Sequence, residues 1–291
     1  VADDGNIYTI VNGLRYALKD NKATVVRQLQ NISGDIEIPL SLNYNNLNYS
    51  VTKIASSAFA GCAAITSIVL PNSIESIENS TFRDCTELQK IVLSKNLQEI
   101  GYGIIDGCDD LAEVYYPGDI ASWCAILEHD TAFSSVSKFY IDGDEVSGNI
   151  VIPEGVEYIG VSAFEGCDGI KSILLPSTLE IIYADAFSGC TNLMQVTFSE
   201  NGTLRGISGG TFNYCTNLSS IEIPSTVTTI YGDAFYGCTK LENVHIEDIT
   251  AWCSINFYDE NANPLYHASN LYLNDKLISG ELSLPESVSK I

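Results

Sequence analysis

The sequence predicts a repeat solenoid that is rich in β structure. We expect a parallel sheet of short strands on its concave face, and turns and helical turns on its convex side. Three features predict this class: a cysteine recurs about every 23 residues, apolar residues keep fixed distances from it, and a short strand pattern follows it. A unit of this length cannot bury an apolar face alone, whereas stacked units share one continuous core. We therefore expect one elongated solenoid rather than two globular domains.

Seven cysteines mark one position of the repeat. They are Cys62, Cys85, Cys108, Cys167, Cys190, Cys215 and Cys238. A large apolar residue, usually Phe, lies three positions before each cysteine, Leu or Ile lies three positions after it, and Ile lies eight positions before it. Because the seven positions are equivalent, we expect their side chains to stack as a structural ladder of buried free thiols.

A short strand of the pattern apolar-x-apolar begins six residues after each of these cysteines, and the pattern occurs at five further places. The twelve predicted strands begin at Ile36, Ile68, Ile91, Val114, Phe139, Ile150, Ile173, Val196, Ile221, Val244, Leu271 and Leu282. Since alternate residues of a strand face opposite sides, the first and third residues should enter the core and the middle residue should face outward. Proline often follows and ends the strand.

The two ends of the chain differ from the repeat. Residues 1–35 lack its columns, and apolar segments on either side of the turn Asp20-Asn21 predict an N-terminal cap that resembles a β-hairpin. The solenoid should occupy residues 36–291. Ile291 falls on the isoleucine position of a repeat, so we expect the solenoid to be truncated within a repeat at its C-terminus.

Two insertions, near residues 117–150 and 247–281, carry a Trp-Cys motif. Asp119 and Asp248 precede the two motifs and are good helix N-caps, so each motif should form a short helical turn with its tryptophan facing inward. Two strand patterns follow each motif, with Asp142-Gly143-Asp144 or Asn274-Asp275-Lys276 between them as a tight turn.

The segments 88–93, 173–182 and 186–190 resemble the BspA-type, or Treponema pallidum-type, leucine-rich repeat. The resemblance extends over roughly residues 31–291, with period, pattern and cysteine position all in agreement. It implies an arc-shaped leucine-rich repeat solenoid. It also implies a protein that is secreted or lies on the surface of a bacterium, where such modules usually serve binding or adhesion.

The charge and composition of the chain exclude several classes of binding partner. The sequence has 37 acidic against 14 basic residues and a formal net charge of −23. This surface repels phosphate backbones, so we expect no nucleic-acid partner. No apolar run approaches the length of a membrane span, which argues against membrane insertion. The sequence contains no Cys-x-x-Cys pair and no EF-hand spacing, so we expect no metal and no cofactor. A weak calcium site remains the alternative to solvated turn carboxylates.

The middle residues of the predicted strands form an outward column that the core does not explain. Its first six members, the predicted binding stripe, are Val69, Val92, Tyr115, Tyr140, Val151 and Leu174. The column then becomes polar, with Thr197, Glu222, His245, Tyr272 and Ser283. A contiguous apolar patch usually marks an interaction site, and tyrosine is a preferred anchor residue. The alternative is that Val and Tyr occur here because they suit any strand surface.

Three functions fit the sequence. The first is a non-enzymatic binding or adhesion module that recognises a protein or glycan through the concave sheet, with a host organism as one source of the ligand. The second is a structural spacer or stalk for another domain. The third and remote one is a hydrolase that uses Cys124 or Cys253. The histidines are His129, His245 and His267, and the two Trp-Cys motifs do not share a Cys–His spacing, so we do not expect an enzyme.

Overall fold

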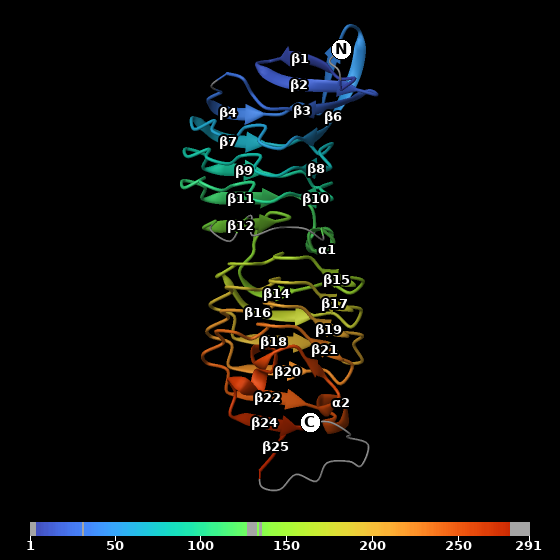
Figure 1. Ribbon diagram of the computed structural model, residues 1–291, viewed down its shortest axis with the longest axis vertical. Helices are drawn as coiled ribbons and strands as arrows, with labels where there is room; N and C mark the ends of the chain where they lie inside the picture. The colour runs from blue at the N-terminus through green and yellow to red at the C-terminus, as the bar shows by residue number, and fades with distance from the viewer. Residues whose placement is uncertain (1–3, 31, 127–132, 134–135, 280–291) are drawn as a thin grey trace. The chain divides into compact units, whose positions relative to one another are not determined.

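The computed structural model describes residues 4–30, 32–126, 133 and 136–279. It divides into a first unit, Val1–Glu145, and a second unit, Val146–Ile291. In each unit, successive turns of the chain, here called rungs, place short strands side by side in parallel (Figure 1). The predicted fold class, a repeat solenoid with parallel sheets of short strands, is confirmed.

The first unit begins with an antiparallel cap. Its strands are β1 (Ile7–Val11), β2 (Leu14–Lys19) and β3 (Lys22–Val25), and β2 pairs with β3 across the Asp20-Asn21 turn. Both turn residues have positive φ angles, 49° and 59°, as the tightest hairpins require. β3 then pairs in parallel with β6 (Leu47–Ile54), which is also antiparallel to β5 (Ser41–Tyr44). The cap therefore continues directly into the repeat.

The main sheet of the first unit is built from the predicted apolar-x-apolar segments. Its parallel strands are β4 (Gly34–Glu37), β7 (Ile65–Val69), β9 (Lys90–Val92), β11 (Glu113–Tyr116) and β12 (Lys138–Ile141). Their first apolar residues are in register, for example Ile68 opposite Ile91 and Val114 opposite Phe139. After β12 the chain reverses at Asp142-Gly143 into β13 (Asp144–Glu145), which pairs antiparallel with β12.

The second unit repeats this arrangement. One ladder contains β14 (Gly148–Val151), β16 (Ile170–Leu175) and β18 (Gln195–Phe198). Another contains β20 (Ser220–Ile223), β22 (Asn243–Ile246) and β24 (Asn270–Leu273), closed by the antiparallel strand β25 (Lys276–Leu277). The predicted strand at Leu282 and the end of the chain at Ile291 lie outside the described residues.

A second, narrower column of strands passes through the isoleucine position of each rung (Figure 1). In the first unit it contains β6, β8 (Ser76–Ile77) and β10 (Glu99–Ile100). In the second unit it contains β15 (Tyr158–Ile159), β17 (Ile181–Ile182), β19 (Gly206–Ile207), β21 (Thr229–Ile230) and β23 (Asn256–Phe257). The strand pattern of the sequence did not predict this second sheet.

The core of each unit lies between the two columns of strands and is filled by stacked phenylalanines. In the second unit, Phe164, Phe187, Phe212 and Phe235 are fully buried, and their ring centroids follow at 5.4, 5.8 and 5.8 Å. These separations fall within the range of favourable aromatic pairs. The rings therefore join each rung to the next in addition to the strand ladders.

The two Trp-Cys motifs form short helices, as predicted. They are α1 (Ile120–Cys124) and α2 (Ile249–Cys253). The Asp119 carboxylate accepts a hydrogen bond from the Ser122 backbone N–H at 2.7 Å, and Asp248 accepts one from the Thr250 N–H at 2.7 Å. Two 3-10 turns, η1 (Glu260–Ala262) and η2 (Pro264–Tyr266), follow α2. Within the described ranges, no helix is long and apolar enough to cross a membrane.

Candidate binding surface

Four of the six predicted stripe residues lie side by side on the first unit. The ladders place Val69 opposite Val92, Val92 opposite Tyr115, and Tyr115 opposite Tyr140. Val69 is 37% exposed and the other three are half-buried. The first unit therefore carries an apolar and aromatic row across four neighbouring strands, from here on called the first-unit stripe.

The last two residues of the first-unit stripe are tyrosines whose rings stack. The Tyr115 and Tyr140 rings are parallel, with 4.4 Å between centroids and 3° between planes. The Lys90 ammonium lies 4.4 Å from the Tyr115 centroid, and the Tyr115 hydroxyl donates to Glu113 Oε2 at 2.9 Å. That hydrogen bond raises the pKa of Tyr115 to about 12, so the phenol stays neutral. A ring held in this way loses little side-chain entropy when a partner binds.

The other two predicted stripe residues lie in the second unit. Val151 is opposite Leu174, and they are 58% and 39% exposed. The chain leaves β12, the last parallel strand of the first unit, through a tight antiparallel turn at Asp142-Gly143, with φ angles of 50° and 87°. The ladders of the first unit thus contain four of the six residues and a ladder of the second unit contains two, and the single row of six stays a prediction.

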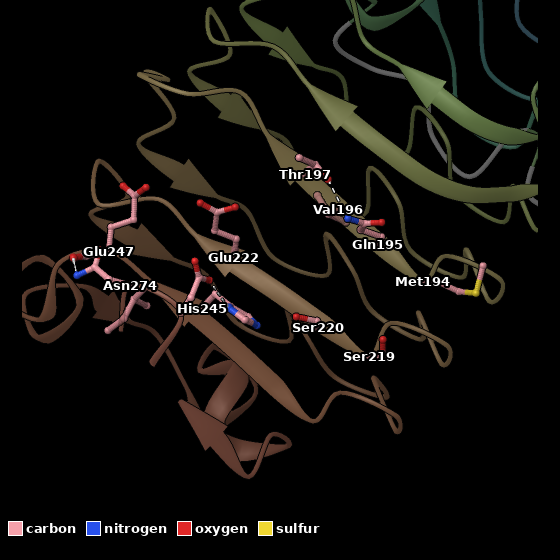
Figure 2. A pocket seen from close by; sticks show the side chains of 12 residues that line it. Met194, Gln195, Val196, Thr197, Ser219, Ser220, Glu222, His245, Glu247 and Asn274 are labelled. Carbon is pink, nitrogen blue, oxygen red and sulfur yellow. Dashed lines mark hydrogen bonds and ion pairs between the residues drawn. The ribbon is translucent and has the colours of Figure 1, made fainter. Parts of the chain in front are cut away.

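The same face of the second unit becomes polar farther along the chain. A groove of about 740 Å³ lies over β18, β20, β22 and the turn after β24 (Figure 2). Glu222 and His245 are opposite each other on β20 and β22, and the His245 ring stacks on Tyr272 at 4.7 Å. His245 Nδ1 is 3.7 Å from an oxygen of Asp275. Burial raises the pKa of Glu222, and the nearby Glu247 carboxylate raises it further.

The groove was not predicted as a site, although its residues were visible in the sequence as the polar end of the outward column. The signal that could have revealed the groove is the cluster of charged residues on neighbouring rungs of this column. Glu222 and His245 occupy the middle positions of consecutive strands, and Glu247 and Asp275 lie just after the ends of β22 and β24. Three carboxylates at one groove favour a cationic group.

The cysteine ladder lies in the core. All seven thiols are free, six are buried, and Cys167 is half-buried. Each of five of them donates a weak hydrogen bond to the carbonyl oxygen of the phenylalanine one rung earlier, over 3.1–3.3 Å; they are Cys85, Cys108, Cys190, Cys215 and Cys238. Burial raises the pKa of the Cys190 and Cys215 thiols, and that of Cys238 to about 12. These thiols therefore stay protonated and are poor nucleophiles.

The two remaining cysteines belong to the Trp-Cys helices. Cys124 is fully buried, and burial raises its thiol pKa, while Cys253 is half-buried. His129 lies outside the described residues. The His267 ring meets Tyr266 edge-on at 5.2 Å, and burial lowers its pKa. Within the described part of the chain, no group of three or more His, Cys, Asp or Glu residues is placed to hold a metal ion.

Comparison with known proteins agrees with the repeat seen in the structure. The family described as "BspA type Leucine rich repeat region" matches in six copies over residues 37–140 and 142–263. No curated protein matches the chain by sequence.

Several solved bacterial structures are similar to the chain. A T. pallidum leucine-rich repeat protein is 26% identical over 73% of this chain and 91% of its own, with a TM-score of 0.49. A leucine-rich cell surface protein from Faecalibacterium prausnitzii is 19% identical over 88% and 99%, with a TM-score of 0.32. A leucine-rich repeat protein from Bacteroides capillosus is 26% identical over 47% and 99%, with a TM-score of 0.38.

The family match covers most of the chain, over residues that contain the rungs of parallel strands described above. The chain therefore belongs to the BspA-type leucine-rich repeat family.

Proposed function

We propose that this chain is a non-enzymatic binding or adhesion module that holds a protein ligand on the first-unit stripe. The observation that carries the proposal is the stacked pair of Tyr115 and Tyr140, in which Lys90 and Glu113 hold Tyr115. Val92 and the exposed Val69 continue the row on the next two strands. Aromatic side chains that are already held in place are typical anchors of protein interfaces. A spacer between other domains would have no need of such a row.

The polar groove of the second unit supports the same function with different chemistry. The carboxylates of Glu222, Glu247 and Asp275 would attract lysine or arginine side chains of a protein ligand. The net charge of −23 adds to that attraction and disfavours nucleic acid. Binding at the groove should weaken as salt rises, whereas binding at the first-unit stripe should persist.

Family membership also supports a place outside the cell, so we propose that the protein is secreted or displayed on the surface of a bacterium. Protease treatment of intact cells that express it should remove the protein while a cytoplasmic marker survives. Survival of both would refute the localisation without touching the binding proposal.

The binding proposal is tested by replacing Tyr115 and Tyr140 with Ser and screening an array of host proteins and glycans at low and high salt. Tyr102→Ser is the matched control, because Tyr102 is 63% exposed and lies outside the first-unit stripe. We expect capture by the native chain and the control at both salt concentrations, and loss of capture by the double variant. Equal capture by all three proteins would exclude the first-unit stripe as the binding surface. No capture by the native chain would favour the alternative function, a structural spacer.

The hydrolase alternative has its own test. Alkylation of accessible thiols should leave ligand capture unchanged, because six of the seven ladder thiols are buried and none of the cysteines belongs to the first-unit stripe. Hydrolytic turnover that disappears on alkylation would contradict the proposal of a non-enzymatic module.

A further inference from the structure

A column of tyrosines runs along the narrow sheet of the second unit, at the position directly after each rung's second strand. The backbone N–H of each member donates to the carbonyl of the strand before it, at 3.0 Å for Tyr183 and Ser208, 2.9 Å for Tyr231 and 3.1 Å for Tyr258. These bonds place the four residues on consecutive rungs, each directly after its strand, β17, β19, β21 or β23. Three of the four are tyrosines, and the second is Ser208.

Where two tyrosines of this column are neighbours, they stack. The Tyr231 and Tyr258 rings are 4.6 Å apart with 22° between planes. The rung between Tyr183 and Tyr231 has no ring, because Ser208 stands there, and Gly206 takes the outward position two residues earlier. A cavity of about 340 Å³ lies at this point, lined among others by Tyr183, Gly206, Ser208 and Tyr231. It is called the tyrosine slot here.

The tyrosine slot has the width of one ring. Neighbouring strands are about 4.8 Å apart, so Tyr183 and Tyr231, which are two rungs apart, are separated by about 10 Å. Rings pack favourably at centroid separations of about 4.5 Å and more, so a guest ring fits between the two with a tyrosine on each face. The floor is open as well, since a Cβ added at Gly206 would meet no atom within 4 Å.

One edge of the tyrosine slot carries a positive charge. Arg205 lines the slot, and its backbone is held by the neighbouring rungs: its N–H donates to the Glu180 carbonyl at 2.9 Å, and its carbonyl accepts from the Thr228 N–H at 2.9 Å. The side chain is exposed and forms no ion pair with the described residues. A guanidinium can bind a carboxylate with two parallel hydrogen bonds.

We propose that the tyrosine slot binds one pyranose ring of an acidic glycan, with the C–H faces of the sugar against Tyr183 and Tyr231 and its carboxylate on Arg205. The Ser208 and Thr229 hydroxyls at the floor and rim can hydrogen-bond the sugar hydroxyls. A phenylalanine or tyrosine side chain would fill the same width but would leave Arg205 without a partner. The site is separate from the first-unit stripe and would give the protein a second, carbohydrate-binding activity.

The test measures binding of galacturonic acid oligosaccharides to the full chain by calorimetry or saturation-transfer NMR, with neutral galactose oligosaccharides as the comparison. The decisive variant is Ser208→Tyr, which completes the tyrosine column and fills the slot with a residue that the neighbouring rungs already accommodate. Because it adds a stacked ring, this variant should fold at least as stably as the native chain. Tyr102→Ser, an exposed tyrosine in the first unit, is the control.

We expect the acidic oligosaccharide to bind, Ser208→Tyr to weaken binding at least about tenfold, and Arg205→Gln to weaken it by a similar factor, as loss of a charged hydrogen bond implies. Tyr102→Ser and the Tyr115/Tyr140 double variant should bind as the native chain does. Unchanged binding in Ser208→Tyr, or no binding of either sugar, would overturn the proposed site. Equal binding of neutral and acidic sugars would overturn the role given to Arg205.

Discussion

The phenylalanine stack makes a quantitative prediction about how the rungs hold together. Phe187 lies between two rings, Phe164 at 5.4 Å and Phe212 at 5.8 Å, and both pairs are within 6° of parallel. Phe235 stacks on Phe212 at 5.8 Å, but on its other side the equivalent position is taken by Ala262. Both phenylalanines are fully buried. Replacement by Leu therefore removes two ring pairs at one site and one at the other.

Each aromatic pair contributes about 0.5–1.5 kcal/mol beyond the area it buries. Phe187→Leu should thus lose about 1–3 kcal/mol of ring–ring stabilisation, and Phe235→Leu about half of that. The remaining cost, from the smaller volume of Leu, should be similar at the two sites.

Urea unfolding of the full chain, followed by circular dichroism, measures both losses. The slopes against urea should match those of the native chain, since the surface exposed on unfolding is unchanged. An equal loss at the two sites, or a larger loss at Phe235, would refute the view that the rings couple neighbouring rungs.

Three further changes test other parts of the structure. Asp248→Ala removes the hydrogen bonds that cap α2 and should lower the free energy of unfolding by about 1 kcal/mol. An unchanged urea unfolding curve would show that the cap does not stabilise the fold. Gly189→Ala forces a side chain into a backbone with φ of 70° and should cost about 1–2 kcal/mol in the same assay, although its Cβ would find room 3.7 Å from Gly166; an unchanged midpoint would contradict the strain. The effect of Glu222→Gln on stability should depend on pH, because the raised pKa of Glu222 means that the folded state disfavours the ionised carboxylate. The native chain loses stability as pH rises from the ordinary carboxyl pKa through the pKa of the folded state. The variant should therefore be as stable as the native chain near pH 3 and more stable at pH 7 by less than about 1 kcal/mol. Thermal unfolding that gives the same difference in stability at both pH values would contradict this reasoning.

The repeat was predictable because each rung places the same residue types in the same surroundings. Phe, Cys and the apolar-x-apolar segment recur together, and a residue that packs against its own copy one rung away leaves a period in the sequence. The narrow second sheet was not predictable in this way. Its strands, such as β8 and β10, are two residues long and bury one isoleucine each, so no alternation of apolar and polar residues exists to be detected.

The candidate sites show the same limit. Counting along the sequence placed Tyr115 opposite Tyr140 correctly, whereas the continuation of the row to Val151, in the second unit, stays a prediction. The segment after the Asp142-Gly143 turn begins as an antiparallel strand, and a strand pattern carries no information about direction. The tyrosine slot is visible only when Ser208 is compared with Tyr183 and Tyr231, one residue beyond the isoleucine column.

The hairpins that follow the two Trp-Cys helices have a consequence for self-association. A parallel ladder that ended on a long apolar strand would offer free N–H and C=O groups to another molecule, which is a common start of aggregation. Here the strand after β12 is the two-residue Asp144–Glu145 and the strand after β24 is Lys276–Leu277. Among the described strands, these two are the last of their ladders. A two-residue strand that carries a charged side chain is a poor template for intermolecular pairing, so each hairpin should disfavour the addition of a strand from another molecule at that point.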